Sequence, residues 1–319
     1  MNTRLIITLL NIPRVGKKTT NKLLKFELPK QLNILQIKEL FIRAKHLNKE
    51  INIPSNESIE EGIKKAEKII EKSNKLNIGY ITILDKEFPQ KLKFIKNPPP
   101  IIYYKGNKEC IFNDKSIAII GSRKANEHSL KVSYRLAEIF TSDEFIIISG
   151  LAKGCDEFAH KGCINSKGKT IAVLPCGLDT IYPKSNEFLA DEILKYDGCL
   201  ISEYQVDTEV QKNNLIERDR IQSALSQCVL IVEASIDSGT MHTANYAIEQ
   251  NKILACYQNP NILNINMGGN EKLIKENKAI IISNKNEIND LKYKINANIN
   301  IKVDNNINTS NDILQLSFL

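Results

Sequence analysis

The sequence predicts an α/β fold built on a mostly parallel sheet, and two patterns predict it. Short continuous apolar runs recur from residue 115 to residue 284, which is typical of parallel strands that are buried on both faces. Helical stretches lie between most of these runs, and alternating strands and helices give a sheet covered by helices on both sides. Because 42% of the 319 residues are hydrophobic, the chain can bury a sizeable core. We therefore expect a Rossmann-like, doubly wound sheet with a small helical amino-terminal domain.

The chain is predicted to divide into three parts. Residues 1–75 are expected to be a small helical domain, in which apolar positions flank a turn at residues 12–19 and a run rich in Lys and Glu occupies residues 59–75. Residues 76–284 are predicted to form the extended Rossmann-like core. Residues 285–319 are an Ile, Asn and Lys mixture and are expected to be a low-complexity tail.

The core is predicted to begin with a connector at residues 76–112. Proline fixes φ and removes backbone donors, so the triplet at 98–100 separates two short strands, at 81–84 and 101–104. The later strands are expected at 117–120, 145–148, 170–174, 199–201, 229–232, 253–255 and 279–282. The helices are expected at 127–141, 156–166, 186–195, 216–225 and 240–250.

The charge of the chain is unevenly placed. Residues 1–100 hold 20 Lys and Arg against 10 Asp and Glu, whereas residues 101–319 hold 24 against 27. This distribution indicates that a polyanionic partner suits the amino-terminal third, and that nucleic acid bound by the remainder must lie in a local groove. A general bias toward Lys and Asn is the alternative explanation of the basic excess.

Several protein classes are excluded by composition. No apolar run approaches the roughly 20 residues that a membrane helix needs, and the apolar residues 5–10 are not followed by a signal-peptide cleavage site. The seven cysteines are odd in number and include no CxxC pair, so neither a disulfide framework nor a zinc site is predicted. We expect a cytoplasmic protein with no metal and no membrane contact.

The informative polar residues lie just after each predicted strand, because ligands of open α/β sheets bind at the carboxyl ends of the strands. Glycine lets a ligand approach the backbone, helix amino termini attract anions, and arginine binds phosphate. A tight turn explains any one such loop, but five loops at one edge favour a phosphate crevice. We predict that it is lined by Gly121, Ser122, Arg123, Gly150, Lys153, Ser238, Gly239 and Thr240, and that Lys212, Arg218 and Arg220 extend it into a basic groove suited to a nucleic-acid strand.

The phosphate compound is not predicted to be a nucleotide cofactor. A dinucleotide fingerprint requires Gly-x-Gly-x-x-Gly after the first strand, and Gly121 stands alone there. The segment from Gly162 to Thr170 has five residues between its glycines and precedes a strand, so it fails as a Walker A loop. We therefore expect no cofactor.

These strand-end residues belong to a longer series of short motifs. The series comprises Gly121-Ser122-Arg123, Ser149-Gly150-Leu151-Ala152-x-Gly154-x-Asp156-x-x-Ala159-His160, Gly168-Lys169-Thr170, Gly177-Leu178-Asp179, Tyr182-Pro183, Ile201-Ser202-Glu203, Arg218-x-Arg220-Ile221 and Ser238-Gly239-Thr240. In order and spacing it resembles the DNA-processing protein A (DprA/Smf) family. The resemblance covers about residues 80–284, and no single motif carries it.

The resemblance implies a function. Members of this family are non-enzymatic, dimeric proteins that bind single-stranded DNA, protect it during natural transformation and load the recombinase RecA onto it. It implies that Gly121, Ser122 and Arg123 cradle a backbone phosphate, and that Lys212 is a basic residue near the DNA.

Two departures from the family pattern bear on affinity. Arg218 and Arg220 match an Arg-Asn-Arg motif, but Asp219 replaces its asparagine and places a negative charge in the proposed groove. Leu215 stands where the family has a DNA-contacting phenylalanine. Base stacking on an aromatic ring is worth about 1–3 kcal/mol, so we expect that contribution to be weakened.

Residues 12–19 resemble a helix-hairpin-helix turn, in which a glycine turn directs helix amides at a DNA phosphate. Gly16, Lys17 and Lys18 would form this second DNA contact, although Arg14 replaces the usual first glycine. A plain loop between two packed helices, or a protein-interaction module, is the alternative.

Two other functions stay open. Nucleotide hydrolases of the phosphoribohydrolase kind resemble this core, but Thr243 occupies the position of their required glutamate. A degenerate family member that acts as a scaffold is the second.

Asp156 and His160 lie four residues apart on a predicted helix. An internal hydrogen bond is favoured over catalysis, because the sequence suggests no nucleophile or third ligand beside them.

Overall fold

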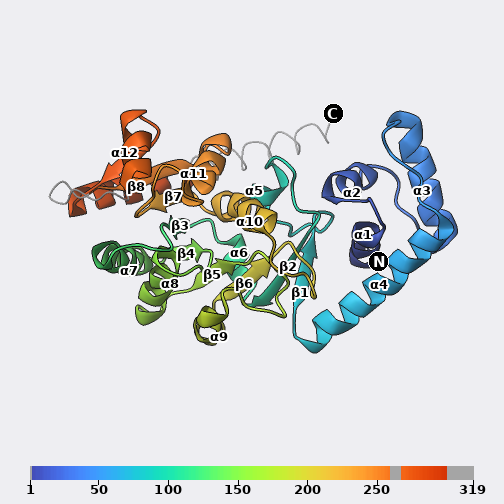
Figure 1. Ribbon diagram of the computed structural model, residues 1–319, viewed down its shortest axis with the longest axis horizontal. Helices are drawn as coiled ribbons and strands as arrows, with labels where there is room; N and C mark the ends of the chain where they lie inside the picture. Colours follow the sequence, from blue (N-terminus) through green and yellow to red (C-terminus); the bar gives the residue numbers. More distant parts are fainter. Residues whose placement is uncertain (1, 259–266, 300–319) are drawn as a thin grey trace, which may run out of the picture. The chain divides into compact units, whose positions relative to one another are not determined.

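The computed structural model describes residues 2–258 and 267–299 (Figure 1). The chain divides into two compact units. The first is assembled from residues 1–105, 174–181 and 200–214. The second comprises residues 106–173, 182–199 and 215–319.

Helices dominate the amino-terminal part of the first unit. They are α1 (Asn2–Asn11), α2 (Lys17–Leu23), α3 (Ile34–Leu47) and α4 (Asn56–Lys75). Asn33 and Ser55 cap α3 and α4, because their side-chain oxygens accept hydrogen bonds from backbone amides in the first turn. Apolar side chains such as Leu9, Phe41 and Ile59 are buried together in the core of this bundle.

The rest of the first unit contains the strands β1 (Gly79–Thr82), β2 (Ile101–Gly106) and β6 (Cys199–Ser202) and the short helix α5 (Gln90–Lys93). β1 pairs antiparallel with β2, so that Tyr80 lies opposite Tyr103. The strand order in this unit is β1-β2-β6.

The amino-terminal helices are joined to distant parts of the chain within the first unit. The side chains of Asn11 and Gln205 exchange hydrogen bonds at 2.9 Å. The Nζ atom of Lys17 lies 3.0 Å from the carboxylate of Glu203. The structure therefore groups residues 1–75 with the 174–181 and 200–214 segments, where the sequence predicted a separate helical domain.

The second unit holds a parallel sheet in the order β5-β4-β3-β7-β8-β9. In the centre, Ala118 of β3 is flanked by Ile148 of β4 and Val229 of β7. The strands are β3 (Ser116–Ile120), β4 (Ile146–Ser149), β5 (Thr170–Val173), β7 (Cys228–Ile231), β8 (Ile253–Tyr257) and β9 (Ile280–Ile282). Every residue of the four adjacent strands β5, β4, β3 and β7 is buried, as expected for strands covered on both faces.

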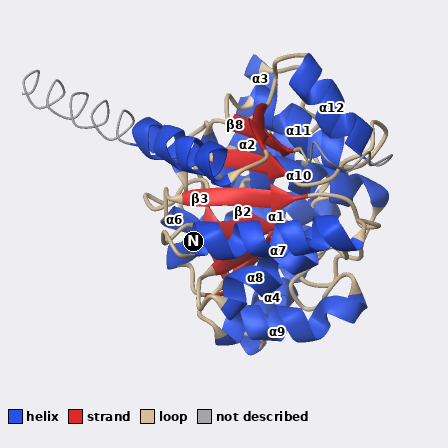
Figure 2. Ribbon diagram, turned by 90° about the vertical axis from the view of Figure 1, so that its left-hand side faces the viewer, coloured by secondary structure: helices blue, strands red, loops and turns tan. Residues whose placement is uncertain are grey.

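Helices cover both faces of this sheet. Figure 2 shows α7 (Glu127–Thr141) and α8 (Cys155–Asn165) on one side of the strands, and α10 (Lys212–Leu225) and α11 (Thr240–Glu249) on the other. The remaining helical elements are α6 (Glu109–Phe112), η1 (Lys184–Asn186), α9 (Glu187–Lys195) and α12 (Gly268–Lys275). The predicted α/β fold with a mostly parallel, doubly wound sheet is confirmed.

Residues 285–299 are helical, although the sequence predicted a low-complexity tail. Ile288, Leu291 and Ile295 are buried in the core of the second unit together with Phe140. Spacings of three and four residues place these side chains on one face of the helix, and this apolar face buries against the core. The prediction of a tail is wrong for this stretch, and residues 300–319 lie outside the described residues.

Among the residues that the structure describes, none of the helices combines the length and apolarity that crossing a membrane requires.

Candidate functional site

Three loops at the carboxyl ends of the strands of the second unit are held together by backbone contacts. The amide of Cys155, after β4, donates to the carbonyl of Ser122, after β3, at 3.2 Å. The amide of Ser122 donates in turn to the carbonyl of Glu233, after β7, at 2.8 Å. A Cβ atom at Gly154, where φ is +82°, would overlap the carbonyl oxygen of Ser122. The structure therefore brings together the predicted residues of these three loops, and glycine is required for their close approach.

The surface of this loop cluster is basic and hydroxyl-rich. Arg123 and Lys153 are exposed, while Gly121 and Ser122 are partly exposed. The hydroxyl of Ser122 accepts a hydrogen bond from the amide of Lys124 at 3.1 Å, which fixes the turn. Backbone amides and cationic side chains on adjoining loops are a recurrent way to bind a phosphate.

Arg218 is buried against the loop after β4, and only 5% of it is exposed. Its Nη1 donates to the carbonyl of Val173 at 2.9 Å, and its Nε lies 3.1 Å from a carboxylate oxygen of Asp219. Its Nη2 lies 4.0 Å from Asp156, which accepts the amide of Gly150 at 3.1 Å. A Cβ atom at Gly150 would overlap the Arg218 guanidinium. The predicted exposed groove residue is thus a buried cross-link between β5, the loop after β4 and the first turn of α8.

The two carboxylates around Arg218 are strongly affected by burial. Desolvation raises the pKa of Asp219 to about 7, although the positive charges of Arg218 and Arg123 oppose the shift. Desolvation likewise raises the pKa of Asp156, again against the charge of Arg218. A hydrogen bond from the Thr243 side chain also favours the charged form of Asp219. The negative charge predicted to line the groove therefore lies under its surface, within electrostatic reach of the exposed Arg123.

The other predicted groove residues of α10 differ in position. Arg220 is 3% exposed, and its Nε lies 3.1 Å from the carboxylate of Glu217. Leu215 is half-buried. Lys212 is exposed at the first residue of α10 and belongs to the first unit. The structure therefore places only Lys212 of the three basic residues at the surface.

The loop after β7 forms a tight turn that leads into α11. The carbonyl of Ser235 accepts both the amide and the hydroxyl of Ser238, at 3.1 and 2.8 Å. Gly239 is exposed, and a side chain there would meet no atom within 4 Å. Thr240 is the first residue of α11. The predicted trio of Ser238, Gly239 and Thr240 therefore stands at an open helix amino terminus.

His160 makes an internal hydrogen bond, but its partner is Thr170 of β5 and not Asp156, the residue four positions before it. Its Nδ1 lies 2.8 Å from the hydroxyl of Thr170, which itself donates to the carbonyl of Ile147 at 2.6 Å. Because a hydroxyl has one proton to give, Nδ1 must be the donor in the first bond. Burial lowers the pKa of His160 to about 3, so the ring is neutral. Within residues 2–258 and 267–299 no three His, Cys, Asp or Glu residues gather as a metal site.

The segment predicted to be a helix-hairpin-helix turn connects α1 to α2 in the first unit. Arg14 adopts φ +67°, a left-handed conformation that favours glycine, at the position where the motif usually has one. Gly16 precedes the first turn of α2, and Lys18 is exposed. Lys17 pairs with Glu203 and lies over the ring of Tyr204, 5.4 Å from its centroid. Lys17 is thus engaged inside the unit, whereas Lys18 faces solvent.

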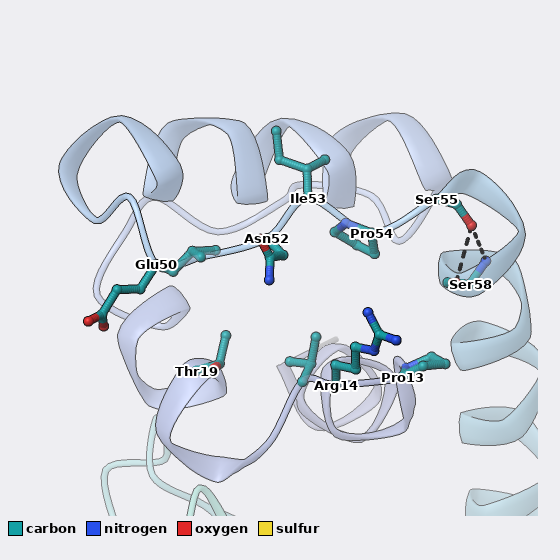
Figure 3. A pocket seen from close by; sticks show the side chains of 11 residues that line it. Pro13, Arg14, Thr19, Glu50, Asn52, Ile53, Pro54, Ser55 and Ser58 are labelled. Carbon is teal, nitrogen blue, oxygen red and sulfur yellow. Dashed lines mark hydrogen bonds between the residues drawn. The ribbon is translucent and has the colours of Figure 1, made fainter.

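A cavity of about 410 Å³ lies on one side of this turn. Figure 3 shows the guanidinium of Arg14 directed toward it, opposite Asn52 and Pro54 of the segment between α3 and α4. At its rim, Ser55 caps α4 through the amide of Ser58. Polar side chains line the cavity from both segments, Arg14 and Thr19 on the side of the turn and Asn52 on the other.

One member of the loop cluster was missed among the predicted site residues. Gly154 supports the approach of the loop after β4 to Ser122, and its signal was the glycine spacing of residues 150–154. The burial of Arg218 had no signal in the sequence, because alternation of charges in residues 217–220 is equally typical of a solvated helix face.

The chain resembles known proteins over most of its length. A family profile described as "DNA recombination-mediator protein A" matches residues 79–292. Protein Smf of Synechocystis sp. is 34% identical over 221 residues, which are 66% of this chain and 55% of that protein. The DNA processing protein DprA of Bacillus subtilis is 34% identical over 194 residues, which are 61% of this chain and 65% of that protein. The match therefore spans less than two thirds of the length of these curated relatives.

Two solved structures are similar to the present one. The X-ray structure of DNA processing protein A (DprA) from Streptococcus pneumoniae has a TM-score of 0.67 at 27% identity, and the match covers 86% of this chain and 97% of that one. The second is a structure of DNA processing protein A from Helicobacter pylori, described by its single-stranded DNA binding mode. It has a TM-score of 0.61 at 30% identity, and the match covers 69% of this chain and 96% of that one. Because the family profile matches well over half of its residues, the chain belongs to the DNA recombination-mediator protein A family.

Proposed function

We propose that this protein binds single-stranded DNA and acts in DNA processing during natural transformation. The observation that carries the proposal is the convergence of the loops after β3, β4 and β7 around the exposed side chains of Arg123 and Lys153. Membership of the family supports it. So does the similarity to the Helicobacter pylori protein, which is described by its single-stranded DNA binding mode.

In the proposed complex, a backbone phosphate lies against Gly121, Ser122 and Arg123. The Ser122 hydroxyl and nearby amides donate hydrogen bonds, and Arg123 supplies the charge. Lys153 binds the neighbouring phosphate from the loop after β4. Because its guanidinium is buried and bound internally, Arg218 acts as a positioning residue that holds Gly150 and Asp156 in place.

The remaining predicted contacts complete the proposal. The open start of α11 at Ser238, Gly239 and Thr240 offers a further anion site. Lys212 adds charge, Leu215 offers an apolar surface in place of an aromatic ring, and Arg220 positions α10. A second DNA contact is assigned to the helix-hairpin-helix turn at Gly16, Lys17 and Lys18.

We also propose the cellular setting. The protein is a non-enzymatic, cytoplasmic homodimer without a cofactor, and it protects incoming DNA and loads RecA onto it. All seven cysteines are buried thiols that form no disulfide, as is usual for proteins of a reducing compartment.

The test measures the fluorescence anisotropy of a labelled oligo-dT strand at two salt concentrations. Arg123→Gln and Lys153→Gln should each weaken binding roughly 10-fold, as expected for loss of one charge-assisted hydrogen bond. Each should also reduce the salt slope by about 0.7, the value for one phosphate on a single strand. Lys167→Gln is the matched control, because Lys167 is exposed in the turn before β5, at the opposite edge of the same sheet.

Three results would contradict the proposal. Unchanged affinity and salt slope in both Arg123→Gln and Lys153→Gln would exclude the loop cluster as the binding site. Displacement of the strand by micromolar AMP, with weak DNA binding, would favour a nucleotide-processing enzyme. Failure of the protein to bind either ligand would favour a scaffold.

A further inference from the structure

Phe94 is the most exposed of the large apolar side chains in the described part of the chain, at 84%. It follows α5 in the first unit, and its neighbours Leu92 and Ile95 are buried. Its amide donates to the carbonyl of Gln90, which closes the short helix. The backbone at Phe94 is therefore fixed from both sides while the ring projects into solvent.

A single exposed apolar side chain is common on protein surfaces and needs no explanation by itself. The surroundings of Phe94 are unusual in their charge. Lys93 and Lys96 are exposed on either side of it, and residues 88–108 contain five lysines and no Asp or Glu. If the exposed neighbours of Phe94 were apolar, they would indicate a protein interface. An aromatic ring among lysines instead indicates a binding site for a polyanion that carries flat apolar groups, as the bases of a nucleic acid are.

The Phe94 segment lies beside the helix-hairpin-helix turn within the first unit. The side-chain amide of Asn21, in α2, donates to the carbonyl of Pro98, four residues after Phe94, at 2.8 Å. Lys18 stands three residues before Asn21, on the same face of α2, and it is exposed. Both of the contacting segments therefore carry exposed lysines, Lys18 in α2 and Lys93 and Lys96 next to Phe94 in the sequence.

We propose that Phe94 is a base-stacking platform for single-stranded nucleic acid, with Lys93, Lys96 and Lys18 as its phosphate contacts. Stacking tolerates any base, and unpaired bases expose their faces whereas paired ones do not. The platform supplies an aromatic ring in a chain that has Leu215 in α10 instead. This inference rests on the proposed function, because it assigns a further contact to the same ligand.

The chain contains no tryptophan, so Phe94→Trp introduces a single fluorescent reporter at the platform. Oligo-dT should quench its fluorescence, while an abasic strand of equal length and charge should leave it almost unchanged. Phe188→Trp is the matched control, because Phe188 is 76% exposed on α9 in the second unit. Equal responses of the two tryptophans, or equal quenching by the two strands, would overturn the stacking assignment.

Affinity provides an independent readout. Phe94→Ala should weaken oligo-dT binding about 5- to 150-fold, the range that corresponds to loss of one stacked base. Binding of the abasic strand should not change, and Phe94→Tyr should retain most of the oligo-dT affinity. Because Phe94 is exposed, the urea unfolding midpoint should be unaffected; a misfolded variant would lose affinity for both strands.

The outcomes separate this inference from the proposed function. If the unaltered protein binds oligo-dT and Phe94→Ala binds it equally well, the platform is wrong and single-strand binding stands. If the unaltered protein does not bind oligo-dT, both are wrong, and this is seen before any variant is made.

Discussion

At the scale of single residues, burial decides what a charged side chain does. Arg218 and Asp219 are adjacent on α10 and both are almost fully buried. A buried charge is tolerated when it is paired and hydrogen-bonded, and Arg218 meets this requirement through Val173, Asp156 and Asp219. Its contribution to ligand binding is therefore indirect, through the loops that it holds.

Asp219→Asn should change how stability depends on pH. The folded pKa of Asp219 is raised to about 7 by burial, above the roughly 3.9 of an unfolded aspartate. Between these values the folded state holds a proton that the unfolded state has lost, so this residue's contribution to stability falls as pH rises and is lost above pH 7. The free energy of unfolding of Asp219→Asn should therefore rise relative to that of the unaltered protein by roughly 1 kcal/mol per pH unit up to pH 7.

Urea unfolding at pH 5, 6, 7 and 8 measures this difference. Asp237→Asn is the control, because Asp237 is exposed in the loop after β7. Parallel pH profiles for Asp219→Asn and the unaltered protein would show that Asp219 is charged throughout. In the same variant, loss of negative charge near Arg123 should strengthen DNA binding at pH 8 and much less at pH 6. Weaker binding at both values would make Asp219 a structural partner of the arginines.

At the scale of elements, the composition of residues 285–299 predicts a tail, whereas their contacts with distant residues make them part of the core. The helix at 285–299 has a polar composition, yet three isoleucine and leucine side chains complete the core beside Phe140. Lys292 of the same helix pairs with Asp143 and lies over the Phe140 ring, 5.6 Å from its centroid. The helix therefore belongs to the second unit as a structural element.

Leu291→Ala should destabilise the protein by about 2–5 kcal/mol, because removing a buried leucine side chain loses its burial and leaves a cavity. Urea unfolding at constant pH measures this loss. Tyr293→Ala is the control on the same helix, since Tyr293 is 76% exposed, and it should change stability by less than about 0.5 kcal/mol. Equal effects of the two substitutions would show that the helix does not pack as described.

At the scale of the whole molecule, the first unit is assembled from three separate stretches of chain. Its amino-terminal helices contribute Lys17 to the buried carboxylate of Glu203 and Lys72 to Asp179. A sequence of helices followed by a sheet is typical of two sequential domains. The contacts show instead that residues 1–75 share one compact unit with residues 174–181 and 200–214.

Deleting residues 1–75 should therefore lower the thermal midpoint of the remaining fragment and expose apolar surface to a hydrophobic dye. The buried carboxylate of Glu203 would lose its ion pair with Lys17, and β1 would lose its contacts with α1. Lys72→Gln in the full chain is the control, because it removes only the ion pairs of the partly exposed Lys72 with Asp179 and Asp207, which solvent screens. If the fragment melts at the same thermal midpoint as the full chain, residues 1–75 are an independent domain and the prediction is wrong.

The sequence by itself determined the strands, most of the longer helices and which loops meet at the carboxyl ends of the strands. Helix α7 spans the predicted residues 127–141, since its apolar positions repeat with the helical period and Asn126 caps it. The site could be predicted because loops after parallel strands share an edge, so Gly121, Arg123 and Lys153 meet without any knowledge of packing.

Only the tertiary structure decided which charged residues are buried and which segments share a unit. Arg218 is hidden and Phe94 is displayed, although arginine is usually exposed and phenylalanine usually buried. The physical reason is that periodicity reports one element's own apolar face, whereas burial of a side chain depends on partners from distant parts of the chain. Val173 and Asp156 lie 45 and 62 residues from Arg218 in the sequence, and no local pattern records that they meet it.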